Sequence, residues 1–202
     1  MSLDAGQLRA RNLRMVAGLA ALFFVPLLAS AWLYYGTSWR PGGHTNHGEL
    51  IQPPRPLPPV DLPRIALGGE LAVADPTLFR SKWTLVYIGD GSCDASCRAT
   101  LYVMRQTRLA LGTEMTRLAR VFLVTGNCCA KDYLARQHAG ITILDASGSA
   151  SAPLLGRFPG DRAHTLYIVD PLGNLMMRYD VRRDPRGLLV DLRRLLELSQ
   201  IG

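Results

Sequence analysis

The sequence predicts an α/β domain that follows one N-terminal membrane-spanning segment. Three observations support this prediction: a long uncharged apolar run near the start, alternating β-rich and helical segments after it, and a strongly amphipathic final helix. Of the 202 residues, 48% are hydrophobic and 19% are charged, which excludes an intrinsically disordered protein. The length fits one ordinary domain with an additional segment.

Residues 15–35 contain no charged side chain. A helix of this length rises roughly 30 Å, the thickness of a bilayer core, and a single proline such as Pro26 is tolerated in such a helix. Three arginines precede the run and few cations follow it soon after. The positive-inside rule therefore predicts a cytoplasmic tail at 1–14 and a transmembrane anchor at 15–36. The remaining chain would then lie on the periplasmic or outer face of the inner (cytoplasmic) membrane, after a single pass.

The alternative interpretation of this segment is a cleaved secretory signal. Ala29-Ser30-Ala31 has the small-residue pattern of a cleavage site. The apolar stretch continues beyond Ala31, which favours the uncleaved anchor. Both interpretations place most of the protein outside the cytoplasm.

Residues 37–60 are predicted to form a tether. Five prolines fall between Pro53 and Pro59. Such a stretch favours extended polyproline geometry and acts as a semi-rigid spacer. The folded domain is then predicted over 61–202.

Within that domain the order of elements predicts the fold. A continuous apolar run at 83–88 suits a buried central strand, and RVFLVT at 120–125 suits a second buried strand. The other predicted elements are a hairpin around Gly68-Gly69, strands at 164–169 and 175–179, and helices at 96–111, at 130–138 and after Asp184. Residues 141–144 fit either a short strand or an irregular segment. This order is the thioredoxin-like arrangement, with a central mixed sheet flanked by helices. Ligands of such folds bind beyond the carboxyl ends of the parallel strands.

The final helix has clear boundary signals. Asp184 suits the N-cap and Pro185 the first turn. Leucines repeat at helical spacing on the predicted buried face: Leu188, Leu189, Leu192, Leu195 and Leu196. We expect Asp191 to lie on the opposite, solvent-facing side, and His138, at the end of a short polar helix, to be solvated.

All four cysteines follow the two central strands. Cys93 and Cys97 form a C-x-x-x-C motif in GDGSCDASCRA, directly after the first strand. If a helix begins inside the motif, both sulfurs reach one face and can form a redox pair or chelate a soft metal such as Cu(I). A helix N-terminus and Arg98 would favour the thiolate, whereas Asp94 would oppose it. We expect the net effect to lower the pKa of the motif thiols. An inert structural disulfide is the alternative in an oxidising compartment.

Cys128 and Cys129 follow the second strand, which should be parallel and adjacent to the first. Both loops would then emerge at one edge of the sheet. Three interpretations stay open: disulfides with the C-x-x-x-C pair that make a thiol relay, accessory copper ligands, or a structural role that includes a vicinal bridge. Four cysteines permit three connectivities, and sequence does not choose among them.

The segment KWTLVYIGDGSCDASCRATLYVM resembles the Sco/SenC family of copper-binding cytochrome oxidase assembly proteins. The resemblance covers roughly residues 50–200 and the anchor. It implies a thioredoxin fold and a copper site built from the two motif cysteines and a distant histidine at the start of a strand. His164, in RAHTLYIVD, matches that histidine, so the resemblance implies Cys93, Cys97 and His164 as ligands of Cu(I) or Cu(II).

The chain departs from the family pattern in two places. Asp94 and Arg98 stand where the family usually has proline after each motif cysteine. The sequence Gly-Asn-Cys-Cys at 126–129 replaces a segment that usually contains Asp-Pro. The chain is therefore identified as a divergent member.

The resemblance implies a metallochaperone whose partner is a cytochrome oxidase subunit or another copper-receiving protein. The alternatives are a metal-free thiol–disulfide reductase acting on oxidase subunit cysteines, a peroxidase-like enzyme, and a non-redox interaction module. Nucleic acid is not an expected partner. The net charge is +7, but no basic run exceeds two residues.

Overall fold

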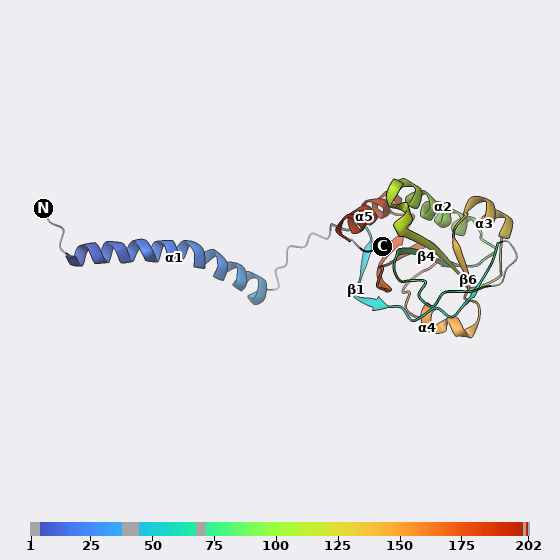
Figure 1. Cartoon of the computed structure of the whole chain (residues 1–202), viewed down its shortest axis with the longest axis horizontal. Helices are drawn as coiled ribbons and strands as arrows, with labels where there is room; N and C mark the ends of the chain where they lie inside the picture. Colours follow the sequence, from blue (N-terminus) through green and yellow to red (C-terminus); the bar gives the residue numbers. More distant parts are fainter. Residues whose placement is uncertain (1–4, 38–44, 68–71, 200, 202) are drawn as a thin grey trace. The chain divides into compact units, whose positions relative to one another are not determined.

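The structure, a computed structural model, describes residues 5–37, 45–67, 72–199 and 201, and divides into two units, Met1–His44 and Thr45–Gly202 (Figure 1). The first unit contains helix α1 (Ala5–Gly36). Its 28 residues from Arg9 to Gly36 are long and apolar enough to cross a membrane, as the sequence predicts. The cytoplasmic tail and the choice between anchor and cleavage after Ala31 stay predictions.

The second unit contains a mixed sheet of eight strands among the described residues, in the order β1-β8-β7-β4-β5-β6-β2-β3. The strands are β1 (Glu49–Pro56), β2 (Pro63–Arg64), β3 (Ala72–Val73), β4 (Trp83–Gly89), β5 (Leu118–Val124), β6 (Thr142–Asp145), β7 (Thr165–Val169) and β8 (Asn174–Asp180). The helices are α2 (Ala95–Ala110), η1 (Gly112–Arg117), α3 (Lys131–Gln137), η2 (Ser149–Ser151), α4 (Ala152–Leu155) and α5 (Pro185–Leu198). β2 and β3 pair as the predicted hairpin, while its Gly68-Gly69 turn lies outside the described residues.

The centre of the sheet is parallel. β4 pairs with β5 in parallel through the crossover helix α2, and β5 pairs with β6 in the same sense. β7 is antiparallel to β4. Gly89 and Val124, the last residues of β4 and β5, are register partners, so the loops that follow these strands start side by side. This topology confirms the predicted thioredoxin-like fold.

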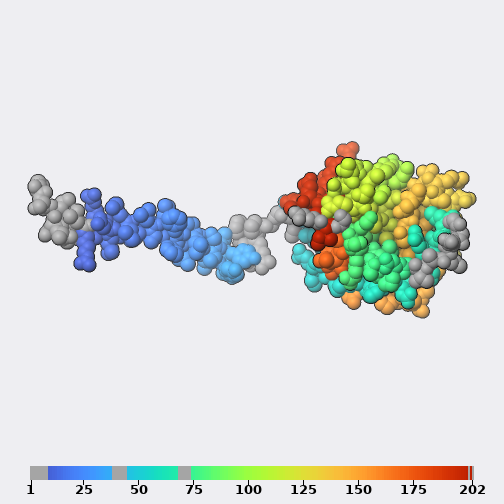
Figure 2. Space-filling view, viewed as in Figure 1, coloured from blue at the N-terminus to red at the C-terminus, as the bar shows by residue number. Residues whose placement is uncertain are grey.

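Helices cover both faces of the sheet, and each face has its own core. Leu85 and Tyr87 of β4 belong to the core beneath α2 and α5, whereas Val86 and Ile88 belong to the core on the α4 side. This alternation follows from the two-residue period of a strand. α2 and α5 adjoin each other on the domain surface, and α4 lies on the other side of the sheet (Figures 1 and 2).

The tether prediction is wrong for the second half of its range. Residues 49–56 form β1, which pairs with β8, and Ile51, Leu57 and Val60 are buried. Apolar side chains before, between and after the prolines join the core, and the prolines are tolerated because β1 lies at the edge of the sheet. Residues 38–44 lie outside the described residues.

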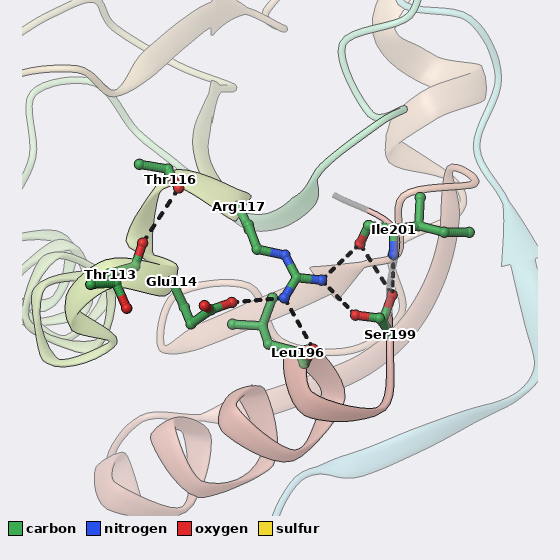
Figure 3. Close-up of polar contacts among 7 residues, drawn as sticks. All are labelled: Thr113, Glu114, Thr116, Arg117, Leu196, Ser199 and Ile201. Atoms are coloured by element: carbon green, nitrogen blue, oxygen red, sulfur yellow. Dashed lines mark hydrogen bonds and ion pairs between the residues drawn. The ribbon is translucent and has the colours of Figure 1, made fainter.

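The capping signals of α5 are confirmed. The Asp184 carboxylate accepts a hydrogen bond from the Gly187 N–H at 2.8 Å, and Pro185 occupies the first turn. At the other end the Arg117 guanidinium donates to three carbonyl oxygens, those of Leu196, Ser199 and Ile201, and pairs with Glu114 (Figure 3). The bonds to Leu196 and Ser199 satisfy carbonyls that the end of α5 leaves without partners, and the bond to Ile201 fastens the segment after the helix to η1.

The prediction that Asp191 faces solvent is wrong, because Asp191 is only 4% exposed. Its carboxylate accepts hydrogen bonds from the backbone N–H groups of His47, at 2.8 Å, and Gly48, at 3.1 Å, and from the Tyr179 hydroxyl. The chain before β1 lies over this face of α5, so Asp191 is covered. His47 also bonds Asp184 through its Nδ1, at 2.9 Å.

The prediction that His138 is solvated is also wrong, because His138 is only 2% exposed. Its Nε2 lies 3.0 Å from the Tyr133 hydroxyl oxygen. Burial, followed by the positive charges of Arg120 and Arg105, lowers the pKa of His138 to about 4. The folded protein therefore holds this imidazole neutral at mildly acidic pH.

We predict that the free energy of unfolding falls between pH 6.5 and pH 4 because of His138. In that interval the unfolded imidazole binds a proton and the folded one does not, so each step toward lower pH favours the unfolded chain. The expected loss over this interval is about 2–3 kcal/mol. Denaturant unfolding at several pH values measures this loss. The free energy of unfolding should depend less steeply on pH in His138→Gln than in the wild type, and an equal pH dependence in the two proteins would contradict the prediction.

Candidate functional site

The loops that follow β4 and β5 are bonded to each other at the carboxyl edge of the sheet. The Gly91 carbonyl accepts a hydrogen bond from the Ala130 N–H at 2.8 Å. The Asp90 carboxylate accepts from the N–H of Ser92 in its own loop, at 2.8 Å, and from the N–H of Asn127 in the other, at 3.1 Å. The expectation that both cysteine loops emerge at one edge is therefore confirmed.

Gly91 lets the two loops approach this closely. A Cβ atom at position 91 would lie 2.5 Å from the Asn127 carbonyl oxygen and 3.1 Å from the Cys128 Cα. Any larger residue would push one loop away from the other. Asp90 and Gly91 were not among the predicted site residues, although the G-D-G run at 89–91 is a turn signal.

Cys93 and Cys97 form a disulfide at the start of α2, with their Cα atoms 5.0 Å apart. Both are buried, at 1% and 2% exposure. Cys93 has φ +54°, a left-handed conformation that costs a non-glycine residue roughly 1–2 kcal/mol. This turn is fastened by hydrogen bonds from the Cys93 N–H to the Asp90 carbonyl, at 3.3 Å, and from the Arg98 Nε to the Cys93 carbonyl, at 3.1 Å.

Asp94 is the N-cap of α2. Its carboxylate accepts from the Cys97 N–H at 2.9 Å and from the Ser96 hydroxyl at 2.8 Å. These two bonds, with a smaller contribution from the charge of His164, lower the pKa of Asp94. The carboxylate is thus negative beside the motif, where it opposes the effect of the helix N-terminus on a thiolate.

We predict that Asp94→Asn raises the reactivity of the reduced motif. Asparagine keeps the capping hydrogen bond but removes the negative charge, so a larger fraction of the thiols ionises. The alkylation rate at pH 7 should rise about two- to threefold. It would be measured in chains that carry Cys128→Ser and Cys129→Ser, with Glu197→Gln as a control distant in sequence. A slower rate in Asp94→Asn would contradict the prediction.

His164 lies immediately before β7 and is half-buried. The neighbouring Ala163 carbonyl accepts hydrogen bonds from the Tyr87 hydroxyl of β4, at 3.3 Å, and the Thr100 hydroxyl of α2, at 3.5 Å. Burial, followed by the charges of Asp94 and Asp161, raises the pKa of Tyr87 to about 12, so its hydroxyl stays protonated as a donor. Two elements that flank the motif therefore fasten the segment that carries His164.

Among the described residues, no three His, Cys, Asp or Glu side chains are already gathered as a metal-binding group. The Cys93 and Cys97 sulfurs are bonded to each other in this structure, and a copper ligand must be a free thiolate. In chemical type, two thiolates and one imidazole suit copper. Copper ligation by Cys93, Cys97 and His164 therefore stays a prediction for the reduced protein.

Cys128 and Cys129 are bonded to each other, so of the three interpretations the structure contains the vicinal bridge. Cys128 is exposed and Cys129 is half-buried. Cys129 packs against the core cluster that includes Cys93 and Cys97. The two cysteine pairs thus occupy neighbouring loops without a bond between them.

Comparisons with known proteins agree with this fold. A family described as "Transmembrane-like, thioredoxin-like, C-terminal domain" matches residues 83–199. No curated protein matches the chain. Solved structures with the same fold include apo Sco1 from Thermus thermophilus, at 21% identity and a TM-score of 0.57, which covers 76% of this chain and 99% of that one.

Two further structures contain bound copper according to their descriptions. ScoI from Bradyrhizobium japonicum is 18% identical with a TM-score of 0.53, and the similarity covers 69% of this chain and 98% of that one. Yeast Sco1 is 14% identical with a TM-score of 0.56, covering 71% and 91%. At these identities the similarity shows a shared fold. Because the family match extends over more than half of the chain, this protein belongs to the transmembrane-like, thioredoxin-like C-terminal domain family, and Sco1 proteins are among its structural neighbours.

Proposed function

We propose that this chain is a membrane-anchored copper-binding thiol protein that assists copper-site assembly in a respiratory cytochrome oxidase. The observation that carries the proposal is the placement of the Cys93–Cys97 pair at the carboxyl end of β4, with the His164 segment fastened to β4 and α2. Two structural neighbours of the same fold are described as copper-bound Sco proteins, which supports the choice of metal.

Copper is the cargo in this proposal. The disulfide must first accept two electrons and two protons, after which Cys93 and Cys97 can act as thiolate donors. A neutral His164 imidazole supplies the third donor, and this mixed sulfur and nitrogen set suits copper. The redox state of the pair would then control loading. Tyr87 and Thr100 contribute by holding the backbone beside His164.

The proposed location follows from the N-terminal helix. α1 would anchor the protein in the inner membrane with residues 1–14 in the cytoplasm. The thioredoxin-like domain would face the periplasm. There it could meet an oxidase subunit or another copper-receiving protein.

The test is the copper content of the reduced full-length protein in detergent, measured in competition with a mild chelator. The wild type should retain about one copper per chain, as expected for a single site built from these three ligands. Cys93→Ser should abolish retention, and His164→Ala should weaken affinity at least about tenfold. His47→Gln is the matched histidine control, because His47 bonds Asp184 at the start of α5. A wild-type protein that retains no copper would overturn the proposal.

A metal-free thiol–disulfide reductase acting on oxidase subunit cysteines is the second candidate. The disulfide between Cys93 and Cys97 favours it, because a dithiol–disulfide pair after a central strand of a thioredoxin-like sheet can exchange with a substrate when local opening of the loop exposes it. His164→Ala discriminates the two functions. It should leave the reduction rate of a peptide disulfide unchanged while it weakens copper retention. A non-redox interaction module would instead leave oxidase assembly intact when both Cys93 and Cys97 are serine.

A further inference from the structure

We propose that Cys128 and Cys129 form a second redox pair, which accepts electrons from an external protein dithiol and passes them to the Cys93–Cys97 disulfide. The inference rests on the proposed function only in requiring that Cys93 and Cys97 cycle between disulfide and dithiol. It assigns Cys128 and Cys129 a role that copper binding alone does not need.

The exposure of the two pairs differs in the way a relay requires. Cys93 and Cys97 are 1% and 2% exposed, whereas Cys128 is exposed. Thiol–disulfide exchange requires a thiolate to approach the sulfur that it attacks. A protein dithiol can therefore reach the Cys128–Cys129 bridge, but the Cys93–Cys97 bridge is covered by its own domain.

The two pairs are neighbours in space. Their loops are joined by the Asp90–Asn127 and Gly91–Ala130 hydrogen bonds, and position 91 leaves no room for a Cβ atom beside Cys128. Cys129 packs against the same core cluster as Cys93 and Cys97. Transfer between the pairs therefore needs only rearrangement within two loops that already touch.

A positive charge lies beside the first cysteine loop and α3. The Arg98 Nε bonds the Cys93 carbonyl, and its guanidinium lies 4.9 Å from the centre of the Tyr133 ring on α3, just after Cys129. A guanidinium in this position favours the thiolate forms that exchange requires. Arg98 therefore contacts both the Cys93 turn and α3, the helix that follows the Cys128–Cys129 loop.

The proposed reaction is two successive exchanges. The external dithiol reduces the Cys128–Cys129 bridge and itself becomes a disulfide. One of the two new thiolates then attacks a sulfur of the Cys93–Cys97 bridge, forming a mixed disulfide and releasing the other cysteine as a thiolate, which takes up a proton. The remaining thiolate of the 128–129 pair attacks the mixed disulfide, restores the Cys128–Cys129 bridge and releases the second cysteine. Two electrons and two protons have then moved from the donor to Cys93 and Cys97.

Trapping the mixed disulfide tests whether the pairs meet. Full-length variants that retain one cysteine of each pair, such as Cys97→Ser with Cys129→Ser, would be oxidised at low protein concentration and digested with trypsin without reduction. Cleavage after Lys82, Arg98, Arg120 and Lys131 isolates the peptides 83–98 and 121–131. At least one of the four combinations should give these peptides cross-linked within one chain. Absence of the intrachain cross-link in all four would overturn the relay.

Reduction kinetics test the direction of transfer. In the full-length chain with Cys128→Ser and Cys129→Ser, reduction of Cys93–Cys97 by a thioredoxin-type dithiol protein should slow at least about tenfold relative to the wild type. With dithiothreitol, a small reductant, the same substitutions should slow the reduction of Cys93–Cys97 less than they do with the protein dithiol. An unchanged rate with the protein dithiol would overturn the proposal. Copper retention by the same variant after chemical reduction distinguishes failure of the relay from failure of the proposed copper function. Loss of copper would mean that the copper function is wrong or needs Cys128 and Cys129 as ligands, whereas failure of the relay alone leaves copper retention intact.

Discussion

Asp191→Ala is expected to lower the free energy of unfolding by about 3–5 kcal/mol. The carboxylate is buried and accepts from the N–H groups of His47 and Gly48 and from the Tyr179 hydroxyl. Burial, with the hydrogen bond to Asp191, raises the pKa of Tyr179, which stays a protonated donor. Alanine leaves these three donors without an acceptor. The Gly48 N–H and the Tyr179 hydroxyl are buried, and each unsatisfied buried group costs about 1–3 kcal/mol.

Chemical denaturation of the full-length protein measures this effect. Glu197→Ala removes the same charge from the same helix at an exposed position and should change stability by less than about 0.5 kcal/mol. Asp191→Asn retains one acceptor oxygen, so its loss of stability should lie between those of Asp191→Ala and Glu197→Ala. If Asp191→Ala cost no more than Glu197→Ala, Asp191 would not hold the chain before β1 against α5.

Gly91→Ala is expected to destabilise the domain by about 2–3 kcal/mol and to slow transfer between the cysteine pairs. The added Cβ would overlap the Asn127 carbonyl oxygen and crowd the Cys128 Cα, which are backbone atoms that a rotamer change does not move. The loops can accommodate it only by separating, which breaks the Gly91–Ala130 hydrogen bond. The yield of intrachain cross-link between the pairs should fall together with stability.

Gly148→Ala is the matched control. Gly148 is exposed at φ −80°, and an added Cβ meets nothing within 4 Å. The expected change in stability is within about 0.5 kcal/mol, and the cross-link yield should be unaffected. Equal behaviour of the two alanine variants would mean that the loops are not held together at Gly91.

Local sequence signals predicted most of the fold correctly. The apolar run at 83–88 became β4, and the helix expected at 96–111 is α2 at Ala95–Ala110. Asp184 and Pro185 begin α5 as expected. These signals work because a continuous apolar run, an N-cap and a first-turn proline act within a few residues of one another.

Features that depend on distant parts of the chain could not be predicted in this way. Asp191 is covered by His47, which lies 144 residues earlier in the sequence. His138 is buried because α3 packs it beside Tyr133 and Arg120, which a short polar helix does not reveal. At the candidate site, the strand positions predicted that the two cysteine loops would be neighbours, but the cysteine pairing required the folded arrangement of both loops.

The placement of β1 has a mechanical consequence for a protein held by its N-terminus. If α1 anchors the chain in a membrane, tension on the N-terminal side would reach the domain at His47 and Gly48 and would load the Asp191 bonds and the pairing of β1 with β8 first. β8 and β7 separate this edge from β4, whose loop carries Cys93, and β5 lies one strand further along. In a chain anchored through α1, such tension would therefore act first at one border of the sheet, separated by two strands from the strand whose loop carries Cys93.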